Sequence, residues 1–566
     1  MPLIHRVAST ISANFDRRDV LQLSVMLFIV IFFLLFPLSL NGWLSRLENA
    51  GARLAHRKRL GMLSIAVGVM AIRLAALPWM PVPVARVHDE FSYLLAGDTF
   101  AHRRLANPPH PMWVFFDTVH VNQHPTYMSK YPPGQGMALA FGQVIGNPWI
   151  GVLLSCAGMC VAIFWALAGW LPASWALLGA TLFAFHVGIF SYWMNSYWGG
   201  AVAALGGALV IGAFPRIVGS WKIGDVGLLG AGAFILAISR PFEGLIFCAP
   251  VVVALAIAAW RQRGKHWPTT TWKVAACLSV TAILLGAFEC YYDFRGTGHA
   301  LVSPYTINGQ TYMITPNFFW QRPRPPFRHT SPQLDDFYNR WALESWQQGR
   351  ATNSMGFVGI TLRNVARLAY FCMWPELALL LPTLFLIFRY RPFRFLLLQL
   401  GICIVGFSLV PWFQPHYAAP AAVTLFILLT QALRMLRHVS YGGRPIGVGL
   451  SRAAVILVAA FAPAHHPYPP DTSAAMLYRW RFAAQLASAP GKDLVIVSYG
   501  RRHDPLDEWV YNAADIDHAK VVWARQIPGV DLQPLLNYFR GRRVWLAEPD
   551  AAPPCLIPFE GSSAPP

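Results

Sequence analysis

Apolar runs of about 20 residues recur along most of this chain, and each run is long enough to cross a bilayer as a helix. Of all residues 55% are hydrophobic and 13% are charged. A soluble globular domain carries about 25% charged residues, so a soluble fold is excluded. The runs predict an all-α, multi-pass transmembrane bundle of about 12 spans.

The formal net charge of +19 does not indicate a nucleic-acid-binding protein. Most Lys and Arg residues fall in short clusters between apolar runs, which is the pattern of cytoplasmic loops. The clearest clusters are Arg261–Lys265 and Arg389–Arg394. If both clusters are cytoplasmic, the two large polar loops, residues 82–133 and 294–362, lie on the outer side of the membrane.

The pattern divides the chain into three regions. Residues 1–59 hold a first span and a basic loop, and residues 60–463 hold the remaining spans. Residues 464–566 begin with a Pro-rich linker and continue as a small soluble α/β domain, which we expect outside the cytoplasm. Its predicted elements are three strands and one helix, at Leu494–Ser498, Lys520–Trp523, Arg543–Leu546 and Leu532–Phe539.

The segment His88–Pro133 concentrates acids, bases and aromatic residues between apolar runs. Asp89 and Glu90 follow a span that ends near Met80. A carboxylate pair at the end of a membrane helix is costly unless it is solvated, paired or used in chemistry. Position alone does not decide between a functional pair and a polar cap at the membrane interface.

The acidic pair, the polar loop and the motif Lys130-Tyr-Pro-Pro133, which opens a short helix, together resemble the GT-C glycosyltransferases that use polyprenyl-phosphate sugars. That family includes protein mannosyltransferases and the aminoarabinose transferases of lipid A, and its Lys-Pro-Pro motif appears here with a Tyr inserted. The resemblance covers about residues 60 to 440. It implies an all-helical bundle, a sugar donor on a lipid phosphate and a loop Asp as general base. Several relatives carry a second acid at an outward helix end, where this chain has Asn195.

Sugar transfer from a lipid phosphate needs a base for the acceptor hydroxyl and cationic groups for the leaving phosphate. Asp89 is the predicted base. Glu90 points about 100° away from it on a helix, so we expect Glu90 and Tyr93 to orient the acceptor. The remaining predictions are a donor phosphate site at Lys130, Arg240 and His416, and a sugar-stacking wall at Trp193, Tyr197 and Trp198.

Each of these assignments has a simpler alternative. Lys130 and Arg240 also suit ordinary anchoring at the membrane interface, and the aromatic residues also suit an aromatic belt. Asp98 and Asp117 are alternative acids that solvation in a loop explains equally well. No cofactor is required and no metal site is predicted. A divalent cation at His88, Asp89 and Glu90, or at His120 and His124, stays an open alternative.

The sequence therefore predicts a glycosyltransferase of a bacterial cytoplasmic (inner) membrane. It moves a sugar from a polyprenyl-phosphate carrier to a hydroxyl of a lipid, glycan or protein on the outer side, by a single inverting displacement. A transporter or lipid flippase is the alternative, and a non-catalytic scaffold is a third hypothesis. A transporter is expected to show paired halves and polar residues at mid-membrane, whereas the polar residues here gather in outer loops.

Overall fold

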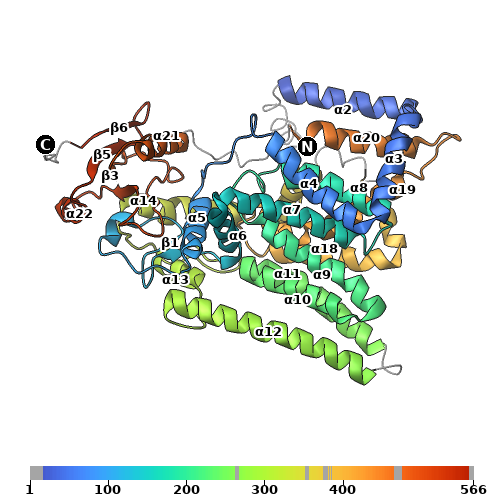
Figure 1. Cartoon of the computed structure of the whole chain (residues 1–566), viewed down its shortest axis with the longest axis horizontal. Helices are drawn as coiled ribbons and strands as arrows, with labels where there is room; N and C mark the ends of the chain where they lie inside the picture. Colours follow the sequence, from blue (N-terminus) through green and yellow to red (C-terminus); the bar gives the residue numbers. More distant parts are fainter. Residues whose placement is uncertain are drawn as a thin grey trace.

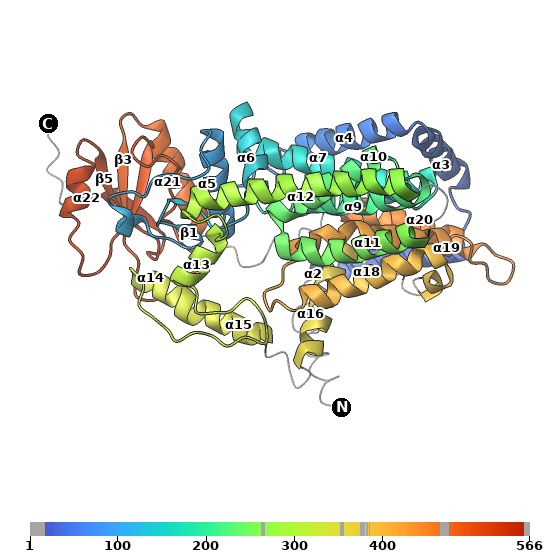
Figure 2. The same cartoon turned by 90° about the horizontal axis from the view of Figure 1, so that it is seen from below.

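The computed structural model describes residues 17–261, 267–350, 356–373, 380, 383, 385–463 and 475–559. Most helices form one elongated bundle, and a small β-sheet lies at one end of it (Figures 1 and 2). Two predicted features fall largely outside the described residues. They are the basic cluster after Arg261 and the linker from residue 464 onwards.

Five helices in the described part of the chain are long and apolar enough to cross a membrane. These spans are α7 (Pro148–Leu167), α9 (Gly200–Ser220), α11 (Pro241–Arg261), most of α12 (Trp267–Thr297), and η7 with α19 (Pro415–Ala421 and Ala422–Leu436). Shorter apolar stretches lie in α2 (Arg17–Leu35), in α8 with η2 (Ala173–Phe183 and Ala184–Ile189), in α10 (Ile223–Ser239) and in α20 (Ile446–Phe461). The mainly helical, membrane-type architecture is confirmed, and the number of about 12 spans stays a prediction.

The remaining helices are shorter or more polar and connect or flank these spans. In chain order they are α3 (Asn41–His56), α4 (Lys58–Ala75), α5 (His88–Ala101), η1 (Trp113–Phe116), α6 (Pro133–Ile145), α13 (Pro304–Tyr312), α14 (Pro332–Asp335), η3 (Asp336–Trp341), α15 (Ala342–Arg350), α16 (Gly356–Met373), η6 (Phe385–Arg389) and α18 (Arg391–Phe407). The loop after α5 also contains a two-residue antiparallel ladder of β1 (Val121–Asn122) and β2 (Met128–Ser129).

Helix α6 packs between α5 and α7 and begins with Pro133 in its first turn, where a proline costs no hydrogen bond. With 13 residues it is about 20 Å long, too short to cross a bilayer. Gly142 on α6 and Gly151 on α7 let the two backbones touch, because an added Cβ at either position would collide with the facing main chain. This close contact fixes α6, and with it the loop that precedes it, against the bundle.

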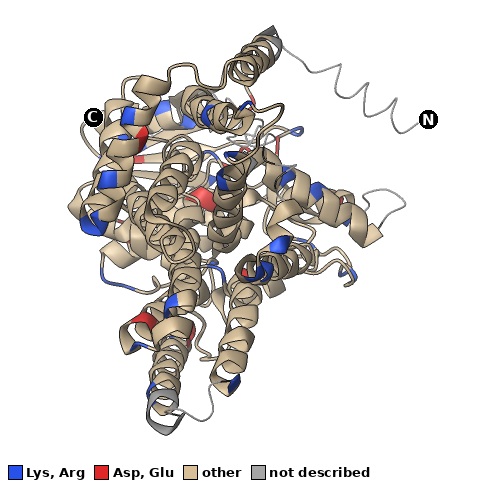
Figure 3. Cartoon of the chain, turned by 90° about the vertical axis from the view of Figure 1, so that its right-hand side faces the viewer, with Lys and Arg blue, Asp and Glu red and all other residues tan. Residues whose placement is uncertain are grey.

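Lys and Arg lie mainly at helix ends and in connecting loops, while the long helices carry few charges (Figure 3). The junction of α3 and α4 holds Arg57, Lys58 and Arg59, and it lies at the end of the bundle away from the sheet (Figure 1). The carboxylate of Glu48 on α3 accepts hydrogen bonds from Arg437, at the end of α19, and from Arg452 on α20. These contacts tie the N-terminal helices to the last part of the bundle.

The C-terminal sheet has the strand order β4-β3-β5-β6. Its elements are α21 (Ala475–Ser488), β3 (Asp493–Val497), β4 (Val521–Arg525), α22 (Gln533–Tyr538), β5 (Arg543–Glu548) and β6 (Cys555–Pro558). β3 runs parallel to β4 and β5, and β6 pairs antiparallel with β5. The three predicted strands and the predicted helix are confirmed as elements. The edge strand β6 was not predicted, because its flanking prolines are typical of a loop.

Helix α5, which carries Asp89, lies between the C-terminal sheet and the helical bundle in both views (Figures 1 and 2). It is not the continuation of a membrane helix, since an extended segment separates α4 from α5. Contacts with its neighbours must therefore set the position of α5.

Candidate functional site

The first turn of α5 is held by the carboxylate of Glu90. Its Oε2 accepts hydrogen bonds from the backbone N–H groups of Arg86 (2.8 Å) and Val87 (3.3 Å), which precede the helix. Its Oε1 accepts the backbone N–H of Tyr197 at 3.0 Å. The residue is 0% exposed. The predicted acceptor-orienting role of Glu90 is therefore not supported, because its carboxylate serves backbone donors and no part of it faces solvent.

We expect Glu90→Gln to lower the thermal stability of the protein. A glutamine keeps one acceptor oxygen but places an N–H₂ group against a backbone donor, which leaves a buried group unsatisfied at a cost of about 1–3 kcal/mol. Thermal unfolding in detergent measures the effect, with exposed Glu344→Gln as the matched control. An unchanged melting temperature for Glu90→Gln would contradict this structural role.

Asp89 differs from Glu90 because one step along a helix turns the side chain by about 100°. Its side chain is 37% exposed. The hydroxyl of Tyr131 donates a hydrogen bond to Oδ1 of Asp89, and Nε2 of His120 lies 3.9 Å from the same oxygen. Tyr131 is the residue inserted in the Lys-Tyr-Pro-Pro motif, so the departure from the family motif supplies the nearest partner of Asp89.

His120 was considered only as a metal ligand in the sequence, and the structure gives it a different setting. Its backbone has a positive φ of 66°, a strained conformation for a residue other than glycine. The backbone is held by three hydrogen bonds: its N–H donates to the Tyr338 hydroxyl (3.2 Å), and its carbonyl accepts from Ser92 Oγ (2.7 Å) and Lys130 N–H (3.3 Å). Burial, with Lys130 nearby, holds the pKa of His120 well below its usual value, so the ring is neutral at neutral pH.

Lys130 is 5% exposed and directs its ammonium group at the rings of Tyr131 (5.1 Å) and Tyr305 (5.4 Å). Burial lowers the pKa of Lys130 to about 8, and the charge of Asp89 partly opposes this shift. No ion pair within 4.0 Å is formed by Lys130 in the described part of the chain. A buried cation of this kind can accept an anionic ligand without first breaking a salt bridge.

Arg240 lies at the end of α10 with its guanidinium 4.6 Å from the ring centre of Tyr417. Burial tends to lower its pKa, but the neighbouring Tyr93, Glu243 and Tyr131 outweigh burial and raise it. Arg240 is therefore charged at all physiological pH values. Tyr131, which contacts both Asp89 and Lys130, is also one of the groups that raise the pKa of Arg240.

Tyr93 and His416 pack against two of these tyrosines. The ring of Tyr93 stacks on Tyr131 at 4.5 Å, and burial, as the main cause, raises the pKa of Tyr93 to about 12. His416 Nδ1 lies 2.9 Å from the hydroxyl of Tyr192, and its ring packs against Tyr417, the residue under Arg240. His416 therefore lies beside Tyr417, whose ring also packs against Arg240. Tyr305 and Tyr417 were missed, because nothing in the sequence relates α13 and η7 to the Asp89 loop.

The predicted sugar-stacking residues are buried. Trp193, Tyr197 and Trp198 are 1%, 6% and 7% exposed. Tyr197 donates its hydroxyl hydrogen to the carbonyl of Pro83 (2.9 Å), and the ring of Trp198 packs on His416 at 4.8 Å. Their rings are enclosed by protein and offer no free face to a sugar here, so sugar stacking by these three residues stays a prediction.

The other candidate acids, Asp117 and Asp98, are engaged in hydrogen bonds of their own. Asp117 is 0% exposed and accepts hydrogen bonds from the hydroxyls of Tyr312 (2.7 Å) and Thr330 (2.6 Å). Asp98 accepts from Gln143 and from the backbone N–H of Ala514. Both carboxylates serve packing contacts, which argues against either of them as the base.

Asn195, which stands where relatives carry an acid, accepts a hydrogen bond from Arg73 Nε at 3.0 Å. Arg73 is fully buried and also donates to the carbonyls of Met80 and Pro81. The Asn195 side chain is therefore part of the contact that fixes the chain between α4 and α5.

Within the described residues, no group of three or more His, Cys, Asp and Glu side chains is arranged to hold a metal ion. The rings of His88 and His120 are 6.0 Å apart between centroids, and His124 is exposed. A divalent cation at either set of histidines stays a prediction.

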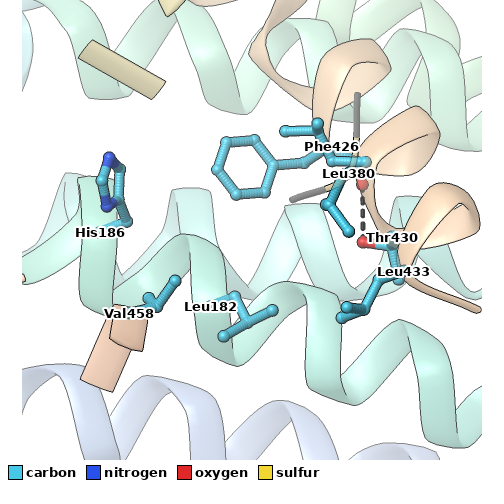
Figure 4. A pocket seen from close by; sticks show the side chains of 8 residues that line it. Leu182, His186, Leu380, Phe426, Thr430, Leu433 and Val458 are labelled. Carbon is cyan, nitrogen blue, oxygen red and sulfur yellow. Dashed lines mark hydrogen bonds between the residues drawn. The ribbon is translucent and has the colours of Figure 1, made fainter. Parts of the chain in front are cut away.

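A separate cavity lies inside the bundle, between α8 with η2, α19 and α20 (Figure 4). Its lining is mainly apolar, formed by Leu182, His186, Leu380, Phe426, Leu429, Thr430, Leu433 and Val458. The hydroxyl of Thr430 is bonded to the carbonyl of Phe426 in its own helix (2.6 Å). This cavity contains none of the charged residues around Asp89, and among the described residues that line it only His186 is titratable.

No protein-family model and no curated protein matches the chain. Among solved structures, it is similar to the crystal structure of ArnT from Cupriavidus metallidurans bound to undecaprenyl phosphate, with 12% identity, a TM-score of 0.45, and coverage of 86% of this chain and 92% of that chain. It is also similar to the Archaeoglobus fulgidus oligosaccharyltransferase in complex with Zn and sulfate, with 12% identity, a TM-score of 0.44, and coverage of 78% and 59%. ArnT, an aminoarabinose transferase, is of the kind that the sequence motifs resemble. With TM-scores below 0.5, these similarities carry no argument about the activity of this chain.

Proposed function

We propose that this chain is a membrane glycosyltransferase that moves a sugar from a polyprenyl-phosphate carrier to an acceptor hydroxyl. One observation carries the proposal: the partly exposed carboxylate of Asp89 accepts a hydrogen bond from Tyr131, and the buried ammonium group of Lys130 lies over the ring of the same tyrosine. A base beside a site for a phosphate is the combination that this reaction requires.

In the proposed reaction, the acceptor hydroxyl attacks the anomeric carbon while Asp89 takes its proton. The bond from the anomeric carbon to the phosphate oxygen breaks, and the electron pair leaves on the phosphate. Lys130 and Arg240 stabilise the negative charge that develops there, and the burial of Lys130 strengthens its effect because the local dielectric is low. A single displacement of this kind inverts the anomeric configuration and needs no covalent enzyme intermediate.

The unequal surroundings of the two acids favour Asp89 as the base. A general base must be able to reach the hydroxyl, and only Asp89 of the pair is exposed. Tyr131 holds Asp89 by one oxygen, which leaves the other carboxylate oxygen for the acceptor. We further propose that Tyr93 supports this arrangement through its stacking on Tyr131.

The proposed orientation places Asp89 and the C-terminal sheet on the outer side of a bacterial inner membrane. It is supported by the basic α3–α4 junction, which lies at the opposite end of the bundle (Figure 1). The carrier lipid would reach the cations from the bilayer, and the acceptor would reach Asp89 from the outer side.

We expect a membrane-impermeant maleimide to label His102→Cys in intact spheroplasts, and Arg59→Cys only after permeabilisation. Both positions are exposed, His102 directly after α5 and Arg59 in the first turn of α4. The substitutions are made in a Cys555→Ser background, because Cys555 in β6 is partly exposed. The background protein serves as the control. Labelling of Arg59→Cys, but not His102→Cys, in intact cells would overturn the orientation.

The function itself is tested with purified protein and a synthetic polyprenyl-phosphate sugar. Release of free polyprenyl phosphate in the presence of envelope extract is the expected result, and mass spectrometry identifies the glycosylated product. If the protein binds and moves the carrier lipid but never cleaves it, a flippase replaces the transferase as the function.

A further inference from the structure

The C-terminal unit, residues 475–559, packs directly on the helix that carries Asp89. Phe91 lies two residues after Asp89 and is 6% exposed. Its ring stacks on Tyr511, with centroids 4.3 Å apart and an interplanar angle of 0°, and on Trp480, with 5.9 Å and 8°. The first turns of α5 are thus packed against two aromatic residues of the C-terminal unit.

Arg479 of α21 fixes this aromatic stack. Its guanidinium lies 4.8 Å from the ring centre of Phe91 and 4.7 Å from that of Trp523 in β4. Its Nε donates to the carbonyl of Trp509 (2.8 Å) and its Nη2 to the carbonyl of Tyr511 (2.9 Å). The planar guanidinium therefore fixes the backbone at Tyr511 relative to Phe91 of α5. A flexible ammonium group would do this less well.

Further contacts bind the chain on both sides of Asp89. Before α5, the carbonyl of Ala85 accepts a hydrogen bond from Trp480 Nε1 at 2.7 Å. Near the other end of α5, Asp98 Oδ2 accepts from the backbone N–H of Ala514 at 2.7 Å. In the following loop, the carbonyl of Asp117 accepts from Arg525, whose charge is balanced by Glu508.

We propose that the C-terminal unit is a clamp that positions α5 and its carboxylate Asp89 through the positioning residues Arg479, Phe91 and Tyr511. This inference rests on the proposed function and gives the C-terminal unit a role that the sequence motifs do not assign. The physical reason is that proton transfer requires a well-defined geometry, and a displacement of about 1 Å can cost about 10²-fold in rate. α5 follows an extended segment, so no membrane helix continues into it and fixes the position of its first turn. The clamp fixes that position instead.

Arg479→Met tests the clamp in the full-length protein. It keeps an apolar stem over Phe91 but removes the charge and both hydrogen bonds to the Tyr511 segment. We expect kcat to fall by about 10–100-fold while KM for the lipid-linked donor stays within about twofold, because the phosphate site is not touched. Arg479→Lys should recover part of the loss. Arg481→Met, two residues along the same helix and exposed, is the matched control and should behave as wild type.

Hydrogen exchange gives a second readout that does not depend on activity. In Arg479→Met, the amides of residues 88–92 should exchange at least about tenfold faster, while those of α7 stay unchanged. If Arg479→Met does not fold, Trp480→Phe replaces it, since that change removes only the donor to Ala85 and keeps an aromatic ring.

The outcomes separate the clamp from the proposed function. Wild-type kcat and wild-type exchange at residues 88–92 in the variants would overturn the clamp and leave the transferase intact. A fall in kcat with unchanged exchange at these residues would also overturn it. If the wild-type protein shows no transferase activity, the proposed function fails, and faster exchange in Arg479→Met still supports a clamp on α5.

Discussion

Asp89→Asn is expected to reduce sugar transfer by at least about 10²–10⁴-fold, with the fold and donor binding retained. Asparagine matches the shape of aspartate and accepts the Tyr131 hydrogen bond through its Oδ1, but it cannot take a proton from the acceptor hydroxyl. The loss should appear in kcat, since the base acts in the transition state and not in donor binding. Turnover of a synthetic polyprenyl-phosphate sugar by purified protein measures it.

Asp531→Asn, on the exposed surface of the C-terminal unit, is the control for the Asp89 experiment. It makes the same chemical change at an exposed position outside α5 and the loop that follows it, and should keep full activity. If Asp89→Asn turns over normally while Asp117→Asn abolishes transfer, the base has been assigned to the wrong acid. If neither substitution matters, the glycosyltransferase proposal fails.

Lys130→Met should weaken binding of the polyprenyl-phosphate carrier by about 10–100-fold, which corresponds to the loss of one charge-assisted contact of about 1.5–3 kcal/mol. Methionine fills a similar volume, so the packing against Tyr131 and Tyr305 is retained. The effect should appear mainly as a raised donor KM and a raised Kd for the carrier phosphate.

The same residue predicts a pH dependence. Burial lowers the pKa of Lys130 to about 8, so the ammonium form that binds a phosphate is present below that value and is lost above it. Carrier affinity of the wild-type protein should therefore fall as the pH rises through about 8. Lys130→Arg should remove this alkaline decline, because a guanidinium stays protonated with a pKa above about 12. An identical decline in Lys130→Arg would show that another group titrates.

The helices and the sheet could be predicted because each depends on a local pattern. Apolar runs of membrane length give the spans, and alternating apolar residues give β3, β4 and β5. The roles of Asp89 and Glu90 could not be separated in this way. Helix geometry predicts that the two side chains point in different directions. Which of them is buried depends on the contact between Glu90 and Tyr197, which lies 107 residues further along the chain.

The same limit applies to the aromatic residues. The motif Tyr192–Trp198 has a composition typical of a binding wall or of a membrane belt, yet its rings are enclosed by His416, Phe371 and Gly200. Tyr305 and Tyr417 carry no local signal at all. Their relevance arises only because α13 and η7 bring them to the cations, and these long-range contacts are not encoded in any local pattern.

The contacts of the C-terminal unit have a consequence for biosynthesis. Trp480 bonds to Ala85 across 395 residues of sequence, and Ala514 bonds to Asp98 across 416. Because the chain is made from its N-terminus at about 5–20 residues per second, the Asp89 segment emerges well before the residues that hold it. A nascent chain arrested before residue 475 would carry both acids and both cations without the clamp. Its rate of sugar transfer would therefore stay low until synthesis and export of the tail are finished, which would limit the use of carrier lipid by unfinished chains.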